Sequence, residues 1–96
     1  MTQPPLSAGL GLAMRVRRAR LGLSQRNAAE RAGLSVKHWG AIERGEKHPG
    51  VETTALVASA LETSLPDLLR DAIDLAPEAA ELSARRRQAP PDERAA

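Results

Sequence analysis

The sequence predicts an all-α protein, a compact bundle of five helices followed by a short C-terminal tail. Two observations favour this fold class. Apolar residues recur at the three- and four-residue spacing of a helix face along most of the chain. Serines that can cap the start of a helix alternate with glycines that can end one, in the order Ser24, Gly33, Ser35 and Gly45. The 96 residues allow one such domain with a modest core.

The first predicted helix covers residues 8–21, and Arg18 falls at the edge of its apolar face. That face consists of Leu10, Ala13, Met14 and Leu21. Because a charge at such an edge needs a partner, we expect Arg18 to pair with an acid, and Glu43 is the obvious candidate. Loss of one partner of a half-buried ion pair leaves an uncompensated charge, so Arg18→Ala is expected to cost roughly 3 kcal/mol in stability.

The second and third predicted helices are short and are separated by a glycine turn. The second helix follows Ser24, and the third runs from Ser35 to Arg44. By their spacing, the residues that the second helix buries are Ala28, Ala29 and Ala32. Those expected to face inward around the third helix are Leu34, Trp39 and Ile42. The outward face of the third helix would then consist of Val36, Lys37, Gly40, Ala41 and Arg44.

The remaining helices are predicted at residues 51–62 and from Ser64 onward. The fourth helix is expected to bury Val51, Val57, Ala58 and Leu61. The apolar residues of the fifth are Leu65, Leu68, Leu69 and Ala72. We expect Pro77 to close the domain, which divides the chain into a domain at 8–75 and a tail at 77–96. The tail has almost no bulky apolar residues, so it is either helical, at residues 78–88, or disordered.

The charges are divided unevenly along the chain. Residues 1–50 carry nine Lys and Arg against three Glu, and residues 51–96 carry five against nine acidic residues. The first half therefore has a net charge of +6, and the second half has a net charge of −4. A basic half favours a polyanionic partner, because attraction to phosphates does not depend on sequence. The acidic half is expected to face away from that partner.

Other classes of function find little support in the composition. The chain has no cysteine, which excludes a disulfide scaffold and fits a cytoplasmic location. It begins without the features of a signal peptide, and no apolar run reaches membrane-spanning length, so we expect no membrane contact. His38 and His48 have no carboxylate at metal-ligand spacing, and no group of serine, histidine and aspartate points to a nucleophile. We therefore expect no metal, no cofactor and no enzymatic activity.

An ordered set of short motifs runs through the first three quarters of the chain. A basic stretch at 15–20 is followed by Leu23-Ser24-Gln25, Ala29, Gly33-Leu34-Ser35, Ile42-Glu43-Arg44-Gly45, Pro49 and Ala58-Ser59-Ala60-Leu61. The set resembles the lambda-repressor/Cro-like (XRE-type) helix-turn-helix family over residues 8–73. The resemblance implies a lambda-repressor-like domain whose third helix enters the major groove of double-stranded DNA. It also implies that Arg18 and Glu43 form an ion pair, and that Gln25 contacts a phosphate and braces the third helix.

The residues expected to contact DNA come from the second and third helices and the loop that follows: Gln25, Arg26, Ser35, Val36, Lys37, His38, Gly40, Ala41, Arg44 and Lys47. Val36 could contact a thymine methyl group. Lys37 could donate to guanine O6 or N7, or bind phosphate only. The basic residues at and after the end of the third helix are interpreted as phosphate clamps. Gly40 has two explanations: room beside Trp39, or close approach of a phosphate.

Together these features predict a sequence-specific transcriptional regulator, a repressor that binds a palindromic operator as a homodimer. The dimer surface is expected on the fifth helix, which offers Leu65, Leu68, Leu69 and Ile73. Three alternatives stay open. The chain could be an antitoxin whose residues 77–96 bind a toxin, a controller protein for a neighbouring operon, or a protein-interaction module that kept the fold and lost DNA binding.

Overall fold

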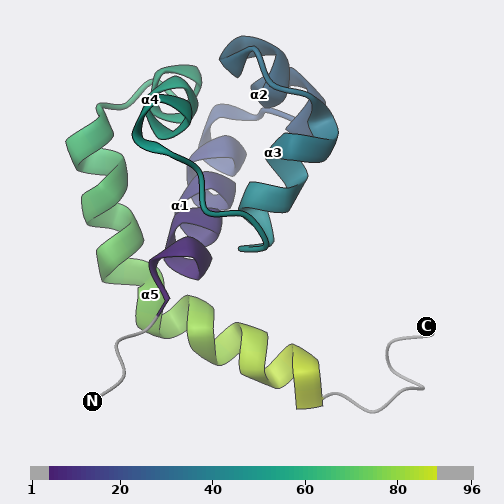
Figure 1. Cartoon of the computed structure of the whole chain (residues 1–96), viewed down its shortest axis with the longest axis vertical. Coiled ribbons are helices and arrows are strands. Elements are labelled where there is room, and N and C mark those ends of the chain that lie inside the picture. Colours follow the sequence, from purple (N-terminus) through teal and green to yellow (C-terminus); the bar gives the residue numbers. More distant parts are fainter. Residues whose placement is uncertain (1–4, 89–96) are drawn as a thin grey trace.

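The structure, a computed structural model, describes residues 5–88, and the side chains of residues 5–86. This part of the chain forms five α-helices and no strand, as the sequence predicts (Figure 1). The helices are α1 (Leu6–Leu21), α2 (Gln25–Ala32), α3 (Val36–Glu43), α4 (Val51–Ala60) and α5 (Leu65–Gln88).

The predicted caps define the ends of the two short helices. The hydroxyl of Ser24 accepts the backbone N–H of Asn27 at 3.0 Å, and the hydroxyl of Ser35 accepts that of His38 at 3.0 Å. Gly33, after α2, has a φ of 74°. This is the left-handed region that glycine enters without steric cost, and it ends the helix. The helix, glycine turn and helix that the sequence predicts are therefore confirmed.

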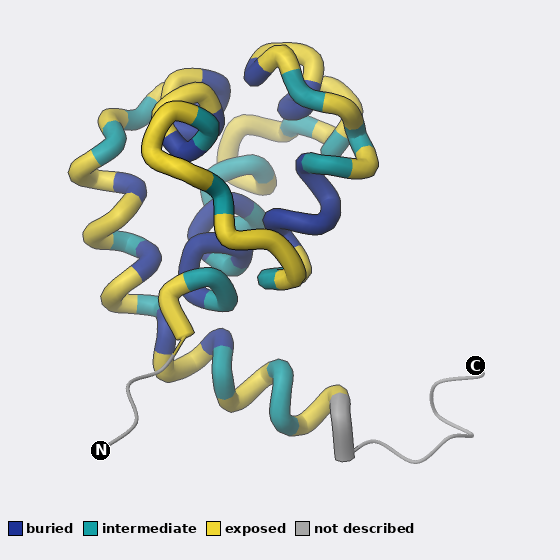
Figure 2. Tube along the Cα trace, viewed as in Figure 1, coloured by how far each residue is buried: buried dark blue, intermediate teal, exposed yellow. Residues whose placement is uncertain are grey.

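The core lies around α1, which runs through the middle of the bundle (Figure 1). Residues that are buried gather where the helices face one another, and exposed residues cover the outside (Figure 2). The largest fully buried side chains are Trp39, Met14, Ile42, Leu61, Leu68 and Val57. The inward position expected for Trp39 is confirmed. Its bulk is packed in one core with the small side chains that α2 contributes: Ala28, Ala29 and Ala32.

Two glycines of α1 allow other helices to approach its backbone. A Cβ atom on Gly9 would overlap the carbonyl oxygen of Ala72 in α5. A Cβ atom on Gly11 would overlap the carbonyl oxygen of Glu43 at the end of α3. Because protein interiors are close-packed, neither position has room for a larger residue. The two glycines thus set the distances at which α3 and α5 pack on α1.

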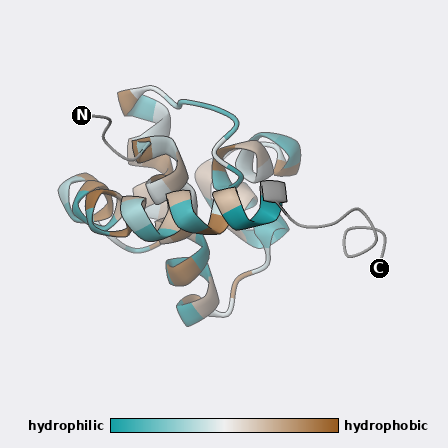
Figure 3. Ribbon diagram, turned by 90° about the horizontal axis from the view of Figure 1, so that it is seen from below, coloured by the Kyte–Doolittle hydropathy of each residue, from teal (hydrophilic) through white to brown (hydrophobic). Residues whose placement is uncertain are grey.

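Helix α5 does not stop at Pro77 but continues through it to Gln88. It bends in this region, as expected where a proline ring prevents one backbone hydrogen bond, and its second half crosses below the bundle (Figures 1 and 3). Ala76 and Ala79, on either side of the proline, are both buried, which favours the continued helix. The helix at 78–88 is confirmed, and the rest of the predicted tail lies outside the described residues. The division into a domain and a tail at Pro77 stays a prediction.

Two expectations about the apolar faces of α4 and α5 are wrong. Val51 is 74% exposed, because it opens α4 before the packed face begins at the buried Thr54. Leu68 is fully buried in the core and cannot belong to a dimer surface. Leu69 and Ile73, at 42% and 58% exposed, keep the outward position expected of them.

The close contact at Gly9 predicts that Gly9→Ala destabilises the protein by about 3 kcal/mol, because α1 and α5 must move apart to admit the methyl group. Gly50→Ala is the matched control, since nothing lies within 4 Å of the added Cβ atom, and its cost should stay below about 1 kcal/mol. Urea unfolding of the two variants measures both values. If Gly9→Ala cost as little stability as Gly50→Ala, the contact between α1 and α5 would not be tight.

Candidate nucleic-acid interface

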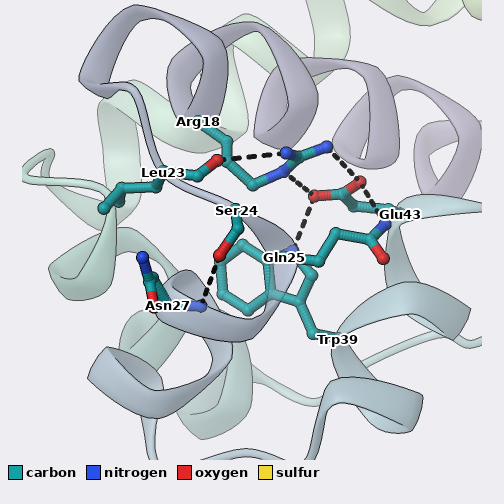
Figure 4. A network of polar contacts seen from close by, with 7 residues as sticks. All are labelled: Arg18, Leu23, Ser24, Gln25, Asn27, Trp39 and Glu43. Atoms are coloured by element: carbon teal, nitrogen blue, oxygen red, sulfur yellow. Dashed lines mark hydrogen bonds and ion pairs between the residues drawn. The ribbon is translucent and has the colours of Figure 1, made fainter.

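The carboxylate of Glu43, at the end of α3, is 3% exposed and accepts four hydrogen bonds (Figure 4). Arg18 donates from Nε to Oε2 at 2.8 Å and from Nη2 to Oε1 at 3.2 Å. Gln25 donates from Nε2 to Oε1 at 3.0 Å, and Trp39 donates from Nε1 to Oε2 at 2.6 Å. Each carboxylate oxygen therefore has two donors, and the donors come from α1, α2 and α3.

This network fixes the orientation of α3 relative to α1 and α2. The predicted ion pair between Arg18 and Glu43 is confirmed, and so is the bracing of α3 by Gln25. Arg18 also donates from Nη1 to the backbone carbonyl of Leu23 at 3.1 Å, which holds the loop between α1 and α2. A buried carboxylate is tolerated only when its oxygens are hydrogen-bonded. The helices can therefore shift relative to one another only by breaking bonds to a buried charge.

The hydrogen bond from Trp39 to Glu43 was not predicted from the sequence. A signal for it was present, because a buried indole N–H needs an acceptor. Residues four positions apart lie on the same side of a helix, so Glu43 was within reach of Trp39.

The structure separates the residues expected to contact DNA by their exposure. Those that are exposed are Arg26, Ser35, Lys37, Arg44 and Lys47. Those that are partly buried are Gln25, Val36 and His38. They lie at the start of α2, at the start of α3 and in the segment after α3, so each of these three segments carries exposed basic side chains.

The outward face of α3 is narrower than predicted. Gly40 and Ala41 are both buried, and Val36 packs partly against the core. The reason at Gly40 is that two long side chains extend over it. The position that its Cβ atom would take is 3.0 Å from Nη1 of Arg44 and 3.8 Å from Oε1 of Gln25. The expected exposure of Gly40 and Ala41 is therefore wrong.

Arg44 pairs with an acidic neighbour, Glu46, which was not predicted from the sequence. Its Nε donates to Oε2 of Glu46 at 2.9 Å, and its Nη2 donates to Oε1 at 3.3 Å. The hydrogen bond from Arg44 lowers the pKa of Glu46 from its ordinary value, and the same bond raises the pKa of Arg44, so both are charged at neutral pH. Both side chains are more than half exposed. Such surface pairs contribute little stability, so the pairing with Glu46 leaves Arg44 available to a phosphate.

Other basic residues of the first half pair with acids of the second half. Nη2 of Arg17 in α1 lies 2.9 Å from Oδ2 of Asp71 in α5. Nη1 of Arg31 in α2 lies 3.1 Å from Oε2 of Glu62, just after α4. Part of the positive charge of the first half is therefore paired with acids of the second half, and these two arginines are less available to a polyanion.

Neither a metal centre nor a membrane span is found in the part of the chain that the structure describes. No group of three His, Asp or Glu side chains there could hold a metal ion. None of its helices is both long and apolar enough to cross a membrane.

The four donors around Glu43 predict that Glu43→Gln destabilises the protein by about 3 kcal/mol. The new amide has one acceptor oxygen instead of two, its nitrogen faces N–H groups, and Arg18 loses its counter-charge. Glu46→Gln makes the same chemical change at an exposed pair and should cost less than about 1 kcal/mol. Urea unfolding followed by the fluorescence of Trp39 compares them. A small loss of stability in both variants would contradict the role given to Glu43.

The chain is similar to known proteins over most of its length. Residues 10–72 match a family described as a helix-turn-helix domain. A crystal structure of the clp gene regulator ClgR from Corynebacterium glutamicum is 34% identical, with a TM-score of 0.71, over 88% of this chain and 87% of that chain. A second ClgR structure from C. glutamicum is 37% identical, with a TM-score of 0.68. The match covers 73% of this chain and 91% of that chain. No curated protein matches. Because the family match covers more than half of the sequence, the chain belongs to the helix-turn-helix family, as its motifs predict.

Proposed function

We propose that the protein is a sequence-specific DNA-binding transcriptional regulator that places α3 in the major groove. One observation carries this proposal. Helix α3 is held by the hydrogen bonds of the buried Glu43, and the exposed basic residues Arg26, Lys37, Arg44 and Lys47 lie at the start of α2, in α3 and in the segment that follows it. An α-helix fits the major groove, and cations around it neutralise the backbone phosphates on either side. Membership of the helix-turn-helix family and the likeness to a gene regulator support the same function.

Within this proposal, Lys37 is the principal reader of bases. It is exposed near the start of α3, the part of a recognition helix that contacts base edges. Its ammonium group suits the O6 and N7 acceptors of guanine, and the exposed part of Val36 suits a thymine methyl group. Arg26, Arg44 and Lys47 contact phosphates. Gln25 uses one N–H on Glu43, and the other is free to contact a phosphate as well.

We further propose that the regulator acts as a homodimer on a palindromic site. Leu69 and Ile73 expose apolar surface on α5, and Leu6 of α1 adds to it at 55% exposure. These residues line one shallow pocket of about 280 Å³ that a second copy could cover. A dimer of this kind presents two α3 helices to half-sites about one helical turn apart. Occupying promoter DNA excludes other proteins from it, so repression is the simplest regulatory outcome.

Selection of bound duplexes from a random DNA pool tests this function. At about 150 mM salt we expect the wild-type protein to enrich a palindrome, and Lys37→Glu to lose it, because the carboxylate repels guanine O6 and N7. Arg70→Glu is the matched control, since Arg70 is an exposed arginine of α5 that pairs with Asp67. It should enrich the same palindrome as the wild type.

Two outcomes would contradict the proposal. Absence of any enriched sequence, with the protein folded, would favour the protein-interaction alternative. An unchanged motif from Lys37→Glu would remove Lys37 from base reading while leaving DNA binding intact.

A further inference from the structure

Gly40 is an unexpected residue at its position, in the middle of α3. Glycine is the weakest helix former after proline, because its backbone loses the most conformational freedom when it is fixed. α3 has only eight residues, and the proposed function depends on its rigidity. A requirement other than helix stability must therefore favour glycine at this position.

The surroundings of Gly40 argue against one explanation that the sequence suggests, the close approach of a phosphate. Apart from its chain neighbours and the backbone of its own helix, the three atoms nearest to the position of an added Cβ atom are Nη1 of Arg44 at 3.0 Å, Oε1 of Gln25 at 3.8 Å and Cζ of Arg44 at 3.9 Å. Gly40 is also buried beneath these side chains, so a phosphate cannot reach its backbone directly.

We propose that Gly40 is a positioning residue for DNA binding, whose missing side chain leaves the space in which the guanidinium of Arg44 lies. This inference rests on the proposed function, in which Arg44 contacts a DNA phosphate. On one side the guanidinium lies over Gly40, and on the other side Glu46 accepts bonds from its Nε and Nη2. Nη1 makes no hydrogen bond with the described residues. The planar group is thus held in one orientation, with Nη1 available to a phosphate oxygen.

A methyl group at position 40 would disturb Arg44 and little else. At 3.0 Å from Nη1 it would be closer than ordinary van der Waals contact, so the guanidinium must shift by a few tenths of an ångström. The side chain of Arg44 is 52% exposed, so its movement costs the fold little. Alanine is also the better helix former. Gly40→Ala should therefore maintain or raise the stability of the fold while it weakens DNA binding, and a purely structural role would not produce these opposite effects.

The test is a double-mutant cycle on Gly40→Ala and Arg44→Ala. The affinity for the duplex enriched in the selection is measured by fluorescence anisotropy over a range of salt concentrations, and the thermal unfolding midpoint is recorded for each variant. Since one phosphate contact contributes about 0.9 to the slope of log K against log salt, Arg44→Ala should weaken binding about fivefold at about 0.15 M salt, per bound copy. Gly40→Ala should cause most of this loss without a lower midpoint, and should cause no further loss when Arg44 is already alanine.

Lys47→Ala provides the control for the cycle, because Lys47 lies in the loop beyond Glu46 and its side chain is not among the atoms around Gly40. The fold-losses of DNA affinity caused by Gly40→Ala and by Lys47→Ala should multiply in the double variant. The inference would be overturned if Gly40→Ala left the DNA affinity unchanged. It would also be overturned if Gly40→Ala lowered the affinity equally in the wild-type protein and in the Arg44→Ala variant. Failure of the wild-type protein to bind any duplex would instead contradict the proposed function.

Discussion

The arrangement of the first three helices depends on one buried charge, the carboxylate of Glu43. Moving a carboxylate out of water costs several kcal/mol, and only a complete set of donors offsets that cost. Here the donors are Arg18, Gln25 and Trp39, from three different helices. The network therefore favours an arrangement in which all three helices are in place together. A helix that must meet DNA at a defined angle benefits from such an all-or-none connection.

A steric constraint complements this electrostatic one. The glycines of α1 let the end of α3 and the middle of α5 pack directly on its backbone. Trp39 then fills a core to which α2 contributes only alanine side chains. A small protein has few residues with which to build a core, so close backbone contact and one large aromatic residue together provide the packing that a larger domain would spread over many side chains.

Features that follow from local chemistry could be predicted from the sequence. Ser24, Ser35 and Gly33 marked the limits of the short helices, because capping and left-handed glycine depend only on neighbouring residues. The pairing of Arg18 with Glu43 was predicted from a charge at the edge of an apolar face and from the family resemblance.

Features that depend on distant neighbours could not be predicted in this way. The burial of Gly40 is due to the side chains of Arg44 and Gln25 extending over it, which no periodicity indicates. Local rules favour a helix end at Pro77, but Ala76 and Ala79 are buried and the helix continues. The pairing of Arg44 with Glu46 crosses the end of α3, where the spacing rules for helix faces no longer apply.

The contact between α1 and α5 has a consequence for the biosynthesis of the protein. Helix α1 is made first, and its principal packing partner is made last among the described helices. A nascent chain that has reached only α4 therefore lacks the helix against which α1 packs most extensively in the finished protein. Contacts between the two ends of a chain slow folding, because the intervening loop must close first. The bundle is thus completed after translation of α5, and the surface of α1 that α5 covers is open to chaperones until then.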